Sequence, residues 1–80
     1  MNKYKSHKTV EAFKIYSITP GAEGVILAGE NANEETATVD SAYLEKHKPQ
    51  VGGYFVRYSD GYLSWSPAKA FEDGYSLANG

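Results

Sequence analysis

The fold is decided by the stretch Tyr54-Phe55-Val56-Arg57-Tyr58-Ser59-Asp60-Gly61-Tyr62-Leu63-Ser64-Trp65. Two runs of aromatic and β-branched residues flank Asp60-Gly61, a dipeptide that tolerates positive φ and favours a two-residue type I′ turn. The sequence therefore predicts a β-hairpin over residues 54–65. A two-residue loop would place Val56 opposite Trp65 and Tyr58 opposite Leu63.

This register sorts the side chains of the predicted hairpin onto two faces. The apolar face, which would pack on the core, holds Tyr54, Val56, Tyr58, Leu63 and Trp65. The other face presents two aromatic rings beside a guanidinium, which suits the anchoring of a protein partner or the stacking of bases. The candidate binding residues are therefore Phe55, Arg57 and Tyr62. The alternative is that a two-layer or intertwined dimeric fold buries this face too, with Phe55 and Tyr62 as ordinary core.

Further strands are predicted on the N-terminal side of the hairpin. One begins at Thr9 and continues to Ile18, and its alternation slips between Ala12 and Phe13, which indicates either a bulge or burial on both faces. Turn residues at 20–24 then lead into a short apolar strand at 25–28. These two strands are expected to pair as a hairpin. The polar segment 29–36 is expected to be a loop.

Two short helices are predicted from their start and stop signals. Asp40 can cap a helix over residues 41–47, which Pro49 ends. Ser66-Pro67 begins a second helix over residues 67–73, with the serine as cap and the proline in the first helical position. The predicted fold class is α+β: an antiparallel sheet of three to five strands, including the hairpin 54–65, with both helices on one face.

The chain length limits the protein to a single small core. Its 80 residues are expected to form a flexible basic arm over 1–8, one α+β domain over 9–77 and a frayed tail over 78–80. The absence of cysteine excludes disulfides and thiolate zinc sites. Self-association into a homo-oligomer would be the remaining way to gain buried area.

The composition limits the classes of partner that the protein is expected to bind. A net charge of −2 and an isoelectric point near 5.6 argue against binding driven by nucleic-acid phosphates. The longest apolar run, 25–28, is far shorter than the roughly 20 residues that cross a bilayer. We therefore expect a protein partner; the charge disfavours nucleic acid, and no membrane segment is expected.

No residue pattern points to catalysis. The only histidines, His7 and His47, are not spaced as metal ligands, and Gly52-Gly53 lacks the lysine of a phosphate-binding loop. Ser64 and Ser66 do not lie in a nucleophile elbow. The sequence predicts that the protein is not an enzyme and has no catalytic residues, no cofactor and no metal.

The stretch from Val51 to Tyr75 contains the motif GGY-x4-SDGY-x-SWSP-x3-FE. It resembles the C-terminal part of small tailed-phage and prophage accessory proteins. The opening of such proteins is similar to the segment 8–13, so the resemblance covers about half of the chain, whereas 21–38 matches none of their pattern. These families have no assigned function. The resemblance implies a phage origin and an accessory role, and it supplies no catalytic residues.

Three functions follow as hypotheses. The leading one is a small phage accessory protein that acts in the host cytoplasm, where it binds and modulates or inhibits a host protein, such as one from a defence system. The first alternative is an oligomeric protein that sequesters a small ligand or nucleotide at its subunit interfaces. The second is a minor component of the virion, whose partner would be a phage protein.

Overall fold

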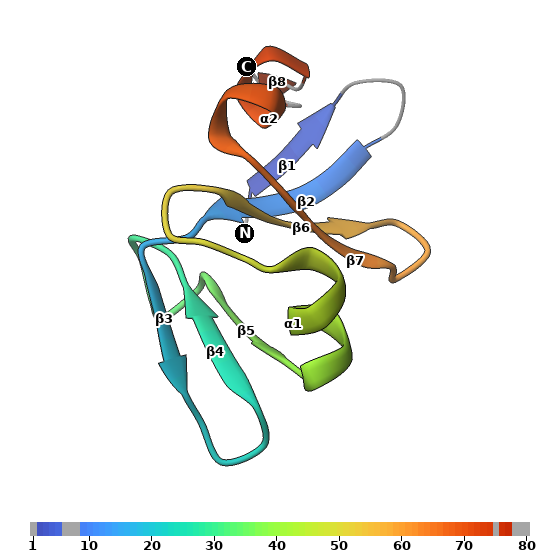
Figure 1. Ribbon diagram of the computed structural model, residues 1–80. Coiled ribbons are helices and arrows are strands. Elements are labelled where there is room, and N and C mark those ends of the chain that lie inside the picture. The colour runs from blue at the N-terminus through green and yellow to red at the C-terminus, as the bar shows by residue number, and fades with distance from the viewer. Residues whose placement is uncertain (1, 6–8, 75, 78–80) are drawn as a thin grey trace.

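The computed structural model describes residues 2–5, 9–74 and 76–77, and its elements confirm the α+β class (Figure 1). Along the chain they are β1 (Asn2–Lys5), β2 (Thr9–Lys14), β3 (Ser17–Pro20), β4 (Val25–Ala28), β5 (Thr36–Val39), α1 (Ser41–His47), β6 (Tyr54–Tyr58), β7 (Leu63–Ser66), α2 (Ala68–Gly74) and β8 (Ser76–Leu77).

The strands form two antiparallel sheets where the sequence predicted one. The larger has the order β7-β6-β2-β1-β8, and the smaller has the order β3-β4-β5. The strand predicted over 9–18 changes sheet at Ile15 and Tyr16. Ile15 N–H donates to Gly53 O (2.8 Å) on the β6 side, whereas Tyr16 N–H donates to Ala28 O (2.7 Å) in β4. Consecutive residues thus pair with different sheets, and β2 and β3 form one bent strand.

The sheets together form an open barrel. With β2 and β3 taken as one strand, and β1 and β8 left aside as additions to the edge of β2, the order of the barrel strands is β5-β4-β3/β2-β6-β7, and α1 connects β5 to β6. This is the topology of the OB-fold, a five-stranded, partly open Greek-key barrel. Within the described residues β5 and β7 are its two ends and are not paired with each other.

Apolar side chains pack on both faces of the larger sheet. The core inside the barrel consists of Phe13, Ile15, Leu27, Val39, Tyr43 and Phe55. The core on the outer face consists of Val10, Ala12, Tyr54, Val56 and Phe71. β2 and β6 contribute to both, so the slip between Ala12 and Phe13 reflects burial on both faces; the two residues pair with Val56 and Phe55 without a bulge.

The helices lie on opposite faces of the larger sheet, which corrects the prediction that they share one. Figure 1 shows α2 above β2 and β6, and α1 with the smaller sheet below them. Tyr43 of α1 belongs to the core inside the barrel, whereas Phe71 of α2 belongs to the outer core. The reason is that both faces of β2 and β6 are apolar, and each needs its own cover.

The hairpin at 54–65 forms, but its predicted register is wrong by one residue. Its loop has three residues, Ser59-Asp60-Gly61, because Gly61 adopts a φ of 92° and its N–H donates to Tyr58 O (2.9 Å). This is a type I turn followed by a left-handed glycine, the usual three-residue hairpin loop. Phe55 therefore pairs with Trp65, and both turn toward the core inside the barrel with Leu63.

Smaller differences concern the ends of elements. The arm expected over 1–8 contains β1, which pairs with β2 and β8, while residues 1 and 6–8 lie outside the described part of the chain, as do 75 and the tail 78–80. β5 was not predicted.

Asp40 caps α1 as expected, since its Oδ1 accepts from Tyr43 N–H (2.9 Å). α2 begins one residue late, and Ser66 Oγ donates to Pro67 O (3.2 Å) instead of accepting from helix amides.

Candidate functional site

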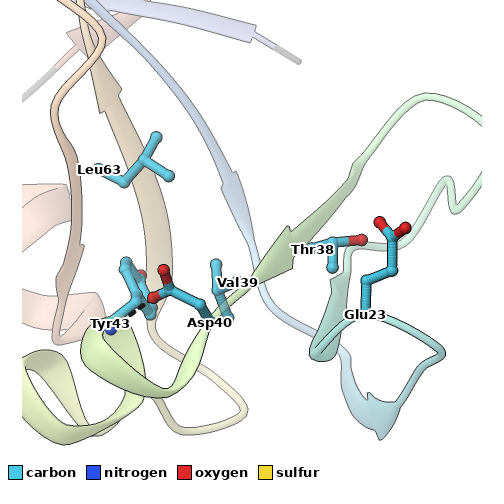
Figure 2. A pocket seen from close by; sticks show the side chains of 6 residues that line it. All are labelled: Glu23, Thr38, Val39, Asp40, Tyr43 and Leu63. Atoms are coloured by element: carbon cyan, nitrogen blue, oxygen red, sulfur yellow. Dashed lines mark hydrogen bonds between the residues drawn. The ribbon is translucent and has the colours of Figure 1, made fainter.

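The opening of the barrel between β5 and β7 forms a cavity of about 310 Å³. Figure 2 shows Leu63 and Tyr43 on one side, Thr38 with Glu23 on the other, and Asp40 and Val39 between them. We call this cavity the β5–β7 groove, and its lining residues are Glu23, Thr38, Val39, Asp40, Tyr43 and Leu63. The groove exists because the barrel does not close at this point.

Tyr43 forms the floor of the groove and ties α1 to β7. Its hydroxyl donates to Ser64 O at 2.6 Å, and its ring lies 6.3 Å from that of Phe55. Burial, with a smaller contribution from Tyr62, raises the pKa of the Tyr43 hydroxyl well above its usual value. The hydroxyl therefore stays protonated and remains a hydrogen-bond donor throughout the physiological pH range.

We expect Tyr43→Phe to lower the free energy of unfolding by about 0.5–1.5 kcal/mol, because Ser64 O loses a hydrogen-bond donor while the ring still fills its place. Urea denaturation followed by circular dichroism measures this difference. The matched control is Tyr16→Phe, since the Tyr16 side chain is exposed. Equal stability of both variants would show that the Tyr43 hydroxyl does not hold α1 on β7.

The two strands that flank the groove direct unpaired backbone groups into it. Residues of an antiparallel ladder alternate between hydrogen-bonded and non-hydrogen-bonded pairs. Gly29 N–H donates to Glu35 O (2.8 Å), which makes that pair a hydrogen-bonded one and turns the N–H and C=O of Thr38 away from β4. The bond from Tyr58 N–H to Tyr62 O (2.9 Å) likewise makes Tyr58 and Tyr62 a hydrogen-bonded pair. By the same alternation, the N–H and C=O of Leu63, the next residue of β7, point away from β6.

The charge of the groove is negative. Its only ionisable side chains besides Tyr43 are Glu23 and Asp40. Asp40 Oδ1 accepts from the backbone of α1, and neither carboxylate has a cationic partner among the residues that the structure describes. The groove therefore combines two strand edges, an apolar floor and two unneutralised carboxylates.

An aromatic rim continues from the groove along α1 to the hairpin tip. The His47 ring lies 4.7 Å from that of Tyr43 and 6.0 Å from that of Tyr62, and Lys46 Nζ lies 5.1 Å from the centre of the Tyr62 ring. Partial burial and the nearby Lys46 charge lower the pKa of His47, so the ring is neutral at pH 7. The rim consists of Lys46, His47 and Tyr62.

The three predicted binding residues do not lie on one surface. Phe55 is 1% exposed and belongs to the core inside the barrel, so it is not available to a partner. Arg57 is exposed and its Nη2 lies 3.0 Å from Glu11 Oε1, beside a second cavity of about 270 Å³. Tyr62 is 44% exposed on the rim. A binding role for Arg57 and Tyr62 remains a prediction.

Few features of the sequence point to the groove. Asp40 was recognised as a helix cap, but its position beside Thr38 and Leu63 depends on which strands end the barrel. Among the described residues there is no group of three or more histidine, cysteine or acidic side chains that could hold a metal ion. None of the described helices has the length and hydrophobicity needed to span a bilayer.

Comparison with known proteins gives one solved structure with a similar fold. The solution structure of the monomeric form of the phage L decoration protein superposes with a TM-score of 0.67 and 26% sequence identity. The alignment covers 96% of this chain and 63% of that chain, so this chain spans less than two thirds of the decoration protein. No protein-family model matches the sequence, and no curated protein matches it either. The similarity agrees with the phage resemblance of residues 51–75.

Proposed function

We propose that the chain is an accessory component of a phage particle that binds to the assembled capsid from outside. The observation that supports this most is the similarity, across 96% of the chain, to a phage decoration protein. The resemblance of the sequence of residues 51–75 to phage accessory proteins supports the proposal independently. On this proposal the partner is a phage structural protein and the site of action is the virion, in place of a host protein in the cytoplasm.

The other two hypotheses have weaker support. Inhibition of a host protein has no counterpart in the comparison. Sequestration of a small ligand at subunit interfaces has no counterpart in the comparison either, and the cavities of about 310 and 270 Å³ lie near the lower end of the roughly 300–1,000 Å³ of typical ligand sites. We further propose that the chain acts by binding alone, without catalysis.

The aromatic rim is suited to such a contact. Tyr62 is among the exposed large apolar side chains, and tyrosine is enriched among the residues that dominate the energy of protein interfaces. Lys46 and His47 hold its ring from the side of α1.

The test uses the phage that encodes the chain. Particles purified from a strain in which the gene is deleted are mixed with the purified, fluorescently labelled protein, and the particles are separated by sedimentation. We expect saturable binding at a fixed number of copies per particle. We also expect the native particle to carry the chain in the same ratio, measured by quantitative mass spectrometry.

Two variants make the result specific. Tyr62→Ala is expected to weaken binding about tenfold, as removal of an interface anchor does, while the fold is retained. Lys69→Ala, on the exposed side of α2, is the matched surface control and is expected to bind as the unchanged protein does. Absence of the chain from native particles, together with no binding to gene-deleted particles, would contradict the proposed function.

A further inference from the structure

We propose that the β5–β7 groove takes up an extended segment of the capsid protein as an added β-strand, with a lysine or arginine of that segment attracted by the negative charge of Glu23 and Asp40. This inference rests on the proposed function for the identity of the partner. Three features of the groove support strand addition: its unpaired backbone groups, its negative charge and its apolar floor.

The backbone groups provide the first step. By the alternation of their ladders, the N–H and C=O of Thr38 point away from β4 and those of Leu63 point away from β6, and both residues line the groove. No hydrogen bond within the described residues joins β5 to β7. An exposed strand edge is a template for pairing with another chain. An extended peptide that adds to such an edge gains main-chain hydrogen bonds, as in strand-addition complexes.

The charges select the side chain of the added strand. Glu23 and Asp40 lie in the same groove without a cationic partner among the described residues, and no lysine, arginine or histidine lines it. A cation in the groove is attracted by both carboxylates, and its charge-assisted hydrogen bond to the one it reaches is stronger than a neutral one. The second cavity lacks this selectivity, because Lys3, Glu11 and Arg57 line it together.

The apolar floor of the groove determines which other side chains of the added strand fit. Val39, Tyr43 and Leu63 present apolar surface between the two strand edges. Side chains of a strand alternate between its faces, so a segment that directs one apolar and one basic residue to opposite faces fits this arrangement. The partner segment is therefore expected to alternate β-branched residues with at least one lysine or arginine.

A peptide titration tests the groove without particles. The probe is a capped heptapeptide of alternating valine and threonine with a central lysine, and its matched control has glutamate in place of lysine. Amide chemical shifts of the 15N-labelled protein are followed by NMR. We expect the lysine peptide to shift the Thr38 and Leu63 amides and to slow their hydrogen exchange, and the glutamate peptide to bind at least roughly tenfold more weakly.

Variants separate the backbone from the charge contribution. Thr38→Pro removes the outward N–H at an edge position, where proline is tolerated, and is expected to abolish peptide binding; Thr38→Val keeps the N–H and should bind normally. The double variant Glu23→Gln/Asp40→Ser keeps a capping side chain on α1 and is expected to bind the lysine peptide roughly tenfold more weakly. Glu30→Gln/Glu34→Gln makes the same change in net charge on the 29–35 loop and should have no effect.

The outcomes distinguish the inference from the proposed function. The Glu23→Gln/Asp40→Ser variant is expected to bind gene-deleted particles roughly tenfold more weakly than the unchanged protein. Equal particle binding by the two proteins would overturn the inference and leave the function standing. Failure of the unchanged protein to bind particles would overturn the function. Thr38 and Leu63 amides that respond to neither peptide, or equally to both, would overturn the groove assignment in either case.

Discussion

Replacing Phe55 with alanine is expected to lower the free energy of unfolding by about 3–5 kcal/mol, as large-to-small changes at fully buried aromatic positions do. Phe55 is 1% exposed, and its ring lies 5.2 Å from that of Phe13 and 6.3 Å from that of Tyr43. It therefore joins β2, β6 and α1 in the core inside the barrel. Because an 80-residue domain has a total stability of only about 4–12 kcal/mol, this change removes a large part of it.

Urea denaturation, followed by tryptophan fluorescence and by circular dichroism, measures this effect. Tyr62→Ala is the control from the same hairpin: its side chain is 44% exposed, and we expect a change of less than about 1 kcal/mol. The pair also separates folding from binding. Phe55→Ala should weaken particle binding only as far as it unfolds the protein, whereas Tyr62→Ala should weaken it in the folded state. A loss below about 1 kcal/mol for Phe55→Ala would mean that the side chain is not in the core.

Replacing Phe71 with alanine is expected to cost about 3–5 kcal/mol as well, but for a different part of the molecule. Phe71 is the buried residue of α2, and its ring stacks on that of Tyr54 at 4.2 Å with an angle of 15°. It covers the outer core, which also contains Val10, Ala12 and Val56. The change therefore takes from the outer core its largest fully buried side chain.

Hydrogen exchange resolves the site of this second effect. In Phe71→Ala we expect the α2 amides to exchange faster than those of β4 and β5, because the core inside the barrel keeps its own contacts. Lys69→Ala removes an exposed ion pair with Asp73 (3.2 Å) and is the control in the same helix, with an expected cost of about 0.2–0.5 kcal/mol. Uniform loss of protection across both sheets would instead show that the two cores unfold as one unit.

Local sequence signals determined a large part of this fold. The α+β class, the hairpin at 54–65, the strand at 25–28 and the cap of α1 by Asp40 depend on residues near one another in the chain, and all are present. Turn and cap residues fix these features through their own backbone preferences and short-range hydrogen bonds. The failure of alternation at Ala12 and Phe13 left a bulge and burial on both faces as alternatives, and the structure shows burial on both faces.

The tertiary structure decided which face of each strand meets which layer. Asp60-Gly61 is compatible with a hairpin loop of two residues or of three. One extra loop residue shifts every β6 residue to the next partner in β7 and so exchanges the two faces. The turn residues alone therefore did not assign Phe55 to a face. The bend at Ile15 and Tyr16 depends on hydrogen bonds to Gly53 and Ala28, which lie far along the chain. The β5–β7 groove has the same origin: whether two strand ends meet or stay apart is set by the closure of the whole barrel, and no local pattern encodes it.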